Sequence, residues 1–343
     1  KDFEKWKASH QPFHWFAEFY GIIHDKGGFD VIIGNPPYVE YSSVTKKYTV
    51  KNFNTLSSGN LYNFVIERAI NIQKNCSYNG MIIPVSAYCT DRMDIFQNLE
   101  LNNCSEIYLS NWAERPSKLF EGAERNLTIA LFKKENNAKN LSIYTTSYYK
   151  WNTCFRKFLF SNISYIDAKS TKIKGIIPKI NSKEEIYLLK RLRQEKKNLG
   201  DFLSRNKTSH TLYYRNSGGR YWKIITNFQP KFYLNNKLDV SSRESYLYFN
   251  DNESLKIAVS ILNSSLYYWY YVMHSDSRTN NPSDLKDFSI NIEQISNENK
   301  NKLSSICDIL MQDINTNSIL QKAKYRTGQV EFQQFFPQKS KSI

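Results

Sequence analysis

The sequence contains no Gly-x-Gly triplet anywhere among its 343 residues, although it has 12 glycines. A Gly-rich turn after the first strand of a doubly wound sheet lets a nucleotide-like cofactor approach the backbone at a helix N-terminus. These residues are therefore expected to lack a complete cofactor site of that kind. Long apolar runs are also missing, since none approaches the roughly 18 residues of a membrane-spanning helix. We predict no membrane-spanning segment.

Cysteine is scarce, and its spacing excludes the common metal-binding patterns. The five cysteines form no Cys-x-x-Cys pair and no spacing with histidine that suits a metal. They are Cys76, Cys89, Cys104, Cys154 and Cys307. Reduced, buried thiols in a cytoplasmic protein are the prediction for all five, and no metal site is predicted.

Charge is present in excess and is unevenly distributed along the chain. Residues 1–150 hold 17 Lys and Arg against 15 Asp and Glu, whereas residues 151–343 hold 30 against 17. Most of the formal net charge of +15 therefore follows residue 150. A basic balance of this size favours a polyanionic partner and predicts a DNA-facing module attached to a nearly neutral one. A basic surface that only aids solubility is the alternative.

The most specific motif is Asn35-Pro36-Pro37-Tyr38, which follows the apolar run Phe29–Ile33. The run predicts a buried strand of a parallel sheet, so the motif leaves the carboxyl end of that strand, where open α/β sheets bind ligands. The two prolines stiffen the loop and remove two N–H donors. An amide oxygen and a carbonyl can then accept both hydrogens of an –NH2 group. A Pro-Pro turn with a solvated Asn and a packed Tyr is the alternative.

With Phe13-His14-Trp15 and Gly27-Gly28 before it, this motif resembles motif IV of the N6-adenine DNA methyltransferases. The lead-in is similar to that of the large bifunctional type II restriction-modification enzymes, which carry methyltransferase and target recognition in one polypeptide. The resemblance implies S-adenosylmethionine as cofactor and double-stranded DNA as partner, with the target adenine flipped out of the duplex. It implies that Asn35 and the Pro36 carbonyl bind the adenine amino group, that Pro37 holds the loop, and that Tyr38 stacks on the base.

Further segments fit this family in order. The sequence predicts a helix over Leu61–Ala69, a buried strand in Gly80–Ser86, and a late strand over Asn126–Phe132 near the sheet edge. In the family, an aromatic residue before that late strand covers the second face of the flipped adenine, and Phe120 is the candidate. A buried structural Phe fits Phe120 equally well.

The predicted fold class is α/β, with a partial doubly wound, Rossmann-like methyltransferase domain over residues 1–150 and an α+β target recognition domain over residues 151–343. Only 34 residues precede Asn35, whereas the preceding strands and helices of a doubly wound sheet need roughly 80 to 100, at about 30 for each βαβ unit. We therefore expect an incomplete S-adenosylmethionine site, completed by the remaining part of the same enzyme or by a partner subunit. A polar hairpin over 135–140 and a last strand over 141–149 are expected to end the first domain.

The second domain carries the predicted DNA contacts. A Ser182-x-x-Glu185 capping box opens a predicted helix through Leu199, whose basic outer face is either phosphate-contacting or simply exposed. A hairpin around Gly218-Gly219 could insert arginine into a groove, or be a structural turn. Two helices are predicted over 257–271 and 300–324, and a flexible polar loop over 274–282 suits base-edge contacts. The predicted DNA-binding residues are Lys207, Arg215, Arg220, Lys223 and Arg278.

Two other functions remain open from the sequence. Asn-Pro-Pro-Tyr also serves amide nitrogens, so a protein glutamine N5-methyltransferase is an alternative, although 308 residues follow Asn35 here. A DNA-binding specificity module without activity of its own is the other. No Pro-Asp…Glu-x-Lys arrangement of a nuclease is visible among these residues.

Overall fold

The chain divides into two compact units, Lys1–Ser182 and Lys183–Ile343. A computed structural model describes residues 2–11, 13–122, 124–138, 140–217, 224–325 and 328–340. The predicted boundary near residue 150 lies inside the first unit, because a short strand at Ile166–Asp167 pairs with the strand that precedes residue 150. The assignment of methyltransferase and recognition roles to the two parts stays a prediction.

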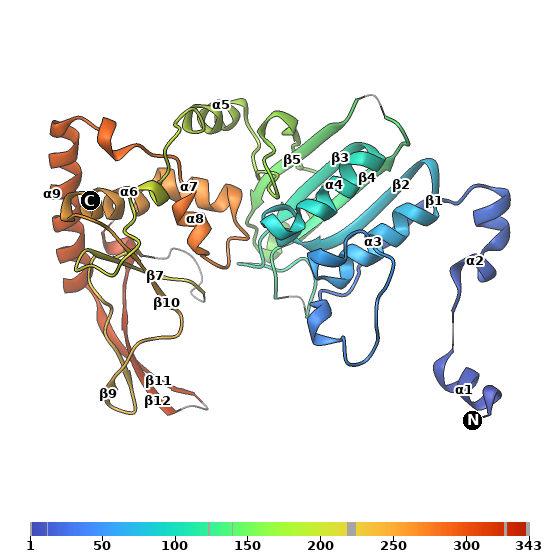
Figure 1. The fold of residues 1–343 in the computed structure, drawn as a ribbon, viewed down its shortest axis with the longest axis horizontal. Helices are drawn as coiled ribbons and strands as arrows, with labels where there is room; N and C mark the ends of the chain where they lie inside the picture. The colour runs from blue at the N-terminus through green and yellow to red at the C-terminus, as the bar shows by residue number, and fades with distance from the viewer. Residues whose placement is uncertain are drawn as a thin grey trace. The chain divides into compact units, whose positions relative to one another are not determined.

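The first unit is built on a six-stranded mixed sheet (Figure 1). Its strands are β1 (Phe29–Gly34), β2 (Gln73–Pro84), β3 (Cys104–Trp112), β4 (Leu127–Lys134), β5 (Ser142–Tyr149) and β6 (Ile166–Asp167), in the order β1-β2-β4-β3-β5-β6. The pairs β1/β2 and β3/β5 are parallel, and β4 runs antiparallel to both of its neighbours. The predicted α/β class is confirmed.

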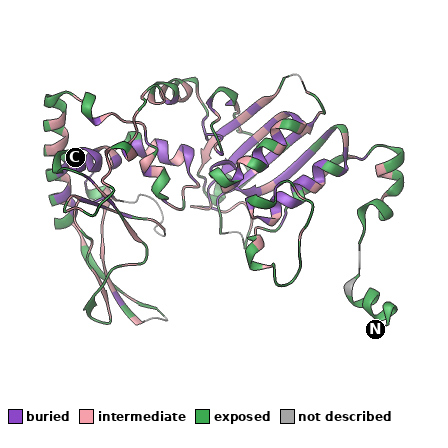
Figure 2. Ribbon diagram, in the orientation of Figure 1, coloured by how far each residue is buried: buried purple, intermediate pink, exposed green. Residues whose placement is uncertain are grey.

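Two helices cover one face of this sheet. They are α3 (Leu61–Ile72) and α4 (Asp94–Asn103), while the exposed α1 (Phe3–His10) and α2 (Trp15–Glu18) precede β1. Tyr62 and Ile66 of α3 and Phe96 of α4 share one core cluster with Ile83 and Ile107 of the strands. Figure 2 shows the buried residues concentrated in the strands and on the sheet-facing sides of these helices. The predicted helix over Leu61–Ala69 and the predicted strand in Gly80–Ser86 are both found.

Strand β1 forms as predicted, but it is not buried. It lies at the edge of the sheet, and Val31 and Ile33 are 56% and 81% exposed. An apolar run looks the same in a central strand and in an uncovered edge strand, so the sequence could not distinguish them. Gly28 fixes the entry into β1: its φ is +125°, and a Cβ there would lie 2.5 Å from the Ile72 carbonyl oxygen. Only glycine fits this close approach.

The late strand was placed wrongly at the sheet edge. Strand β4 lies in the sheet interior, between β2 and β3. The expected hairpin over 135–140 is also wrong, because β3 lies between β4 and β5 and the segment connects two strands that do not pair. Strand order depends on long-range pairing that a hydrophobic pattern does not encode.

The second unit combines two small sheets with a helical layer, as an α+β arrangement. Its strands are β7 (Thr211–Arg215), β8 (Phe232–Leu234), β9 (Lys237–Leu238), β10 (Glu244–Tyr248), β11 (Ile319–Tyr325) and β12 (Gly328–Gln334). Its helices are α5 (Lys183–Leu192), α6 (Asn252–Leu262), α7 (Ser265–His274), α8 (Pro282–Lys286) and α9 (Asn297–Thr316). Strands β10 and β7 pair, and β11-β12-β8-β9 form a second sheet.

Several helices of this unit have bounds that differ from the predicted ones. The helix opened by the capping box ends at Leu192, not Leu199. The helix predicted over 257–271 is two helices, because the Ser264 side chain caps a new one by accepting from the Tyr267 N–H. The helix predicted over 300–324 ends at Thr316, and β11 follows it. Competing β pairing with β12 overrides the helical periodicity of that last segment.

The expectation for the cysteines is partly wrong. All five are free thiols, but Cys76 and Cys154 are exposed, while Cys89, Cys104 and Cys307 are buried. Within the described part of the chain, no helix combines the length and the apolar character that crossing a bilayer requires.

Candidate active site

The motif loop lies at one end of the sheet together with three other strand termini. Register pairs Gly34 with Met81, and it aligns both Pro84 and Trp112 with Leu127. The carboxyl ends of β1, β2 and β3 and the start of β4 therefore meet at the same edge. This is the edge at which α/β sheets bind ligands.

Asn126 ties the exits of β2 and β3 together at this edge. Its carbonyl accepts from the Val85 N–H at 3.0 Å, and its side-chain Oδ1 accepts from the Glu114 N–H at 3.0 Å. Two loops that approach the motif are thus held by one residue.

Within the motif, the Tyr38 hydroxyl fixes the Asn35 side chain. The hydroxyl oxygen lies 2.6 Å from Asn35 Oδ1 and 2.9 Å from the Ile82 carbonyl oxygen, and both of these atoms are acceptors. One phenolic proton serves two acceptors, which places the amide oxygen of Asn35 next to the exit of β2. Asn35 itself is exposed, so its second lone pair is open to a donor from solvent or substrate.

The surroundings keep this hydroxyl protonated. The ring of Tyr38 packs against the core of the first unit, and partial burial raises its pKa to about 12. Desolvation is the physical cause, because burial disfavours the phenolate. Tyr38 is therefore a neutral hydrogen-bond donor at physiological pH. Pro36 is buried and Pro37 is exposed, so only the first of the two prolines packs inside the protein.

Glu40, two residues after the motif, forms an ion pair with a residue distant in sequence. Arg92 donates from both terminal nitrogens to the Glu40 carboxylate, with Nη1–Oε2 at 3.1 Å and Nη2–Oε1 at 2.5 Å. Asn60 Nδ2 also donates to Glu40, at 3.2 Å. A bidentate Arg–carboxylate contact has a fixed geometry. It locks the chain directly after Tyr38–Val39.

Phe120 lies half-buried in the loop between β3 and β4, which starts and ends at the motif edge. Arg156 holds that loop, because its two terminal nitrogens donate to the carbonyls of Leu119 at 2.9 Å and Lys118 at 2.8 Å. The Arg156 guanidinium lies 4.8 Å from the Trp151 ring centroid. Phe120 is therefore on a loop that Arg156 holds and that begins and ends at the motif edge.

The predicted DNA-binding residues of the second unit do not all lie together. Arg215 ends β7, and the loop carrying Arg278 lies beside it, since the Asn280 N–H donates to the Asn216 carbonyl at 2.8 Å. Lys207 is exposed and precedes β7, at the opposite end of this five-residue strand. Arg220 and Lys223 fall outside the described residues. In the loop over 274–282, which is predicted to be flexible, Asp276 accepts from the backbone N–H groups of 278 and 279.

Arg215 has a second cation beside it. Desolvation and the like charge of Arg243 lower the pKa of Arg215, which remains a cation because arginine does not deprotonate in proteins. In the described ranges no ion pair neutralises either arginine. Two adjacent uncompensated guanidinium groups favour an anion.

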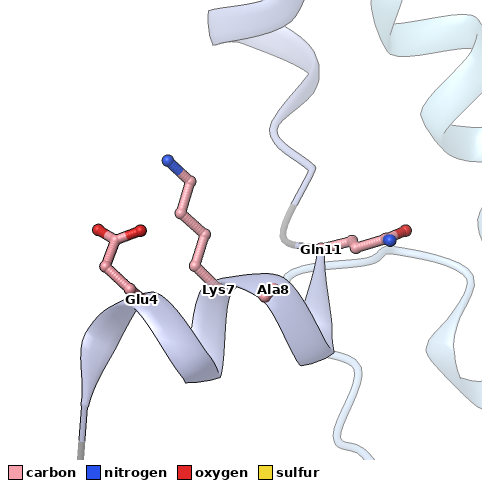
Figure 3. Close-up of a pocket in the computed structure, with 4 residues that line it drawn as sticks. All are labelled: Glu4, Lys7, Ala8 and Gln11. Atoms are coloured by element: carbon pink, nitrogen blue, oxygen red, sulfur yellow. The ribbon is translucent and has the colours of Figure 1, made fainter.

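The described residues place the exposed Asn35 amide at the motif edge of the sheet. Strand β1 pairs only with β2 in the described part of the sheet, and no strand with a Gly-rich turn lies on its outer side. S-adenosylmethionine does not fit these residues alone. Figure 3 shows a pocket at α1 lined by Glu4, Lys7, Ala8 and Gln11, all of them exposed. It contains no residue of the motif edge.

A known protein family matches the part of the chain that contains the motif. Residues 1–120 match the Eco57I restriction-modification methylase family. The resemblance drawn from Asn35–Tyr38 is thereby confirmed at the level of this family. Restriction-modification methylases and this chain share the motif-bearing part of the first unit.

Two curated proteins match as well. The protein RM.MjaORFECS2P of Methanocaldococcus jannaschii, named as a type II restriction enzyme and methyltransferase, is 36% identical over 147 residues, which is 41% of this chain and 11% of that protein. The type II restriction enzyme and methyltransferase RM.Eco57I of Escherichia coli is 25% identical over 229 residues, 64% of this chain and 21% of that protein. The chain thus spans 11% and 21% of the length of these relatives.

Two of the solved structures that match have TM-scores below 0.5. A nuclease-deletion mutant of the Type ISP restriction-modification enzyme LlaGI, in complex with a DNA substrate mimic, is 11% identical with a TM-score of 0.46, covering 84% of this chain and 42% of that one. The Type IIL enzyme MmeI in complex with DNA is 10% identical with a TM-score of 0.44, covering 83% and 49%.

Sequence reasoning missed the residues that support the motif. Ile82 contacts Tyr38 across 44 residues of chain, Arg92 contacts Glu40 beyond the motif across 52, and Asn126 joins two loops near it. No local pattern marks these residues, because each acts through pairing of distant segments. The contact between Asn35 and Tyr38 spans only three residues, and the spacing of the motif alone could have suggested it.

Proposed function

We propose that this chain carries the base-binding part of a site-specific N6-adenine DNA methyltransferase of the restriction-modification kind. The observation that carries the proposal is the Tyr38 hydroxyl 2.6 Å from Asn35 Oδ1, at the carboxyl end of β1. This contact fixes an amide oxygen at the ligand-binding edge of the sheet. The match of residues 1–120 to the methylase family supports the same reaction class.

In the proposed site, Asn35 Oδ1 and the Pro36 carbonyl accept the two hydrogens of the adenine amino group. Acceptance of both hydrogens raises the electron density on that nitrogen, which must act as the nucleophile. Preorganised acceptors also stabilise the positive charge that develops on the nitrogen during transfer. Pro37 keeps the loop rigid, and no covalent enzyme intermediate is needed.

Two aromatic side chains complete the proposed base pocket. The half-buried Tyr38 ring stacks on one face of the extruded adenine, and Phe120 covers the second face. Stacking offsets part of the few kcal/mol that extruding a base requires. The anchoring of the Phe120 loop by Arg156 supports this role, because a stacking residue must be held in place.

In our proposal, S-adenosylmethionine supplies the methyl group. Residues other than those described complete its binding site. Exposed apolar residues on one face of the sheet support a cofactor site that other residues complete. Val31, Ile33, Tyr78 and Leu131 are adjacent on the face opposite α3 and α4 and are 56%, 81%, 56% and 44% exposed. Strands β1 and β2 form a parallel pair, and parallel sheets normally have both faces covered. The remaining part of the same enzyme, or a partner subunit, covers this face and extends the sheet beyond β1.

Double-stranded DNA is the proposed partner of both units. In the second unit, Arg215 at the end of β7 lies beside the loop that carries Arg278, and Arg243 is next to Arg215. Arginine suits either a phosphate or the O6 and N7 edge of guanine. Lys207 contributes a separate phosphate contact at the other end of β7, and Arg220 and Lys223 remain candidates from the sequence alone.

The test compares Asn35→Ala with the control Asn102→Ala in the full-length protein. Asn102 is an exposed asparagine of α4. We expect Asn35→Ala to abolish transfer of labelled methyl groups from S-adenosylmethionine to DNA and to leave DNA affinity largely unchanged, whereas the control keeps both. Mass spectrometry of the product distinguishes methylated adenine from methylated glutamine in protein. Retained DNA methylation by Asn35→Ala would refute the proposal.

A further inference from the structure

A basic loop begins four residues after the motif. Residues 42–53, which we call the basic loop, contain Lys46, Lys47 and Lys51 and no acidic residue. All three lysines are exposed, and Tyr48 between them is 46% exposed. Figure 1 shows this segment, between β1 and α3, extending away from the sheet.

The base of the basic loop is closed by backbone contacts. The Tyr41 N–H donates to the Gly59 carbonyl at 2.8 Å, and the Leu61 N–H donates to the Val39 carbonyl at 3.0 Å. The loop therefore leaves and re-enters the fold next to the motif. Inside it, the Val50 N–H donates to the Tyr41 hydroxyl at 2.8 Å. A loop with tied ends presents its tip in a limited set of orientations.

The nearby carboxylates are already occupied. Glu40 forms the bidentate pair with Arg92. Glu67 of α3 is 2% exposed and accepts from the N–H groups and side chains of both Asn54 and Thr55, at distances between 2.7 and 3.0 Å. No ion pair to Lys46, Lys47 or Lys51 occurs within the described ranges. The three positive charges are therefore uncompensated at the tip.

The structural boundary also changes the charge of the first unit. Residues 1–182 hold 23 Lys and Arg against 16 Asp and Glu, a net of +7, and residues 183–343 hold 24 against 16, a net of +8. The near neutrality inferred for residues 1–150 does not describe the whole compact unit. Both units are basic, so a polyanion can contact either of them.

We propose that the basic loop binds the sugar-phosphate backbone of DNA beside the nucleotide that enters the motif edge. Lys46, Lys47 and Lys51 contact phosphates, and Tyr48 packs against a sugar or an unstacked base. The inference rests on the proposed function, because it takes DNA as the substrate. Backbone contacts next to Asn35 hold the target strand without reading its sequence.

The experiment measures DNA affinity of the full-length protein by fluorescence anisotropy across a salt series. The variant is Lys46→Gln/Lys47→Gln/Lys51→Gln. We expect the slope of log affinity against log salt to become shallower by about 2.7, since each lost phosphate contact removes about 0.9. With affinities that converge near roughly 1 M salt, the affinity at about 0.1 M salt falls by about 2.7 orders of magnitude, equally for different DNA sequences.

Two matched variants separate charge from structure. Lys46→Arg/Lys47→Arg/Lys51→Arg keeps the charges and is expected to keep the slope. Lys5→Gln/Lys7→Gln/Lys26→Gln removes the same number of charges from exposed positions before β1 and is expected to keep it too. An unchanged slope in the basic-loop variant, or an equal loss in the arginine variant, would overturn the role of the basic loop. A wild-type protein that neither binds DNA nor methylates it would instead overturn the proposed function.

Discussion

At the residue scale, Tyr38 has two physical roles in the structure. Its ring belongs to the packing of the first unit, and its hydroxyl contacts Asn35 Oδ1 and the Ile82 carbonyl. The first role stabilises the fold and the second orients the amide proposed to bind the substrate. A substitution that keeps the ring and removes the hydroxyl separates these roles.

We predict that Tyr38→Phe keeps the fold but slows methylation, because Asn35 loses the donor that fixes its oxygen. Loss of the hydrogen bond lowers the free energy of unfolding by about 1 kcal/mol. The raised pKa, about 12, gives a second readout. Above pH 10 the unfolded chain loses the Tyr38 proton before the folded chain does, so stability falls as pH rises from about 10 to 12. Denaturant titrations at several pH values should show a shallower fall for Tyr38→Phe, and identical slopes would contradict this assignment.

At the element scale, helix α3 anchors the return of the basic loop. Buried Glu67 accepts four hydrogen bonds from Asn54 and Thr55, which precede the helix. The carboxylate satisfies backbone donors that would otherwise be buried without partners. Helix α3 thereby fixes both a face of the sheet core and the segment that follows the motif.

We predict that Glu67→Gln lowers the free energy of unfolding by about 2 to 3 kcal/mol, because an amide NH2 group then faces donors that need an acceptor. The control is Glu298→Gln, which removes a 76% exposed carboxylate paired with Lys302 and should change stability by less than about 0.5 kcal/mol. Urea unfolding of both variants measures the difference. Equal effects would show that the Glu67 contacts do not hold the loop.

At the scale of the whole molecule, one face of the sheet of the first unit has exposed apolar residues on β1, β2 and β4. Core residues of α3 and α4 occupy the other face, while Val31, Ile33, Tyr78 and Leu131 are exposed. Contiguous exposed apolar residues mark a surface that contacts another part of a protein or a partner. In the proposal, the remaining part of the same enzyme or a partner subunit completes the cofactor site and also covers these exposed residues.

We predict that Ile33→Ser destabilises the full-length protein by more than about 1 kcal/mol, since a side chain covered there loses its apolar burial. The control Leu238→Ser replaces a residue of β9 that is 75% exposed and should be nearly neutral. Thermal unfolding of the two variants measures this contrast. A neutral Ile33→Ser would show that nothing covers the face.

The sequence by itself determined the α/β class, the motif and the resemblance of residues 1–120 to a restriction-modification methylase family, because these depend on short local patterns. Asn35–Tyr38 follow a strand as predicted, and α3 and β2 lie where their periodicities indicate. Tertiary structure decided the strand order, the edge position of β1 and the strand β11 within a helical pattern, because each depends on pairing between distant segments. It also decided that Tyr38 orients Asn35 beside Ile82, and that Glu40 and Glu67 are occupied while Lys46, Lys47 and Lys51 are exposed. Charge can be counted along a chain, but only the fold determines which charges have partners.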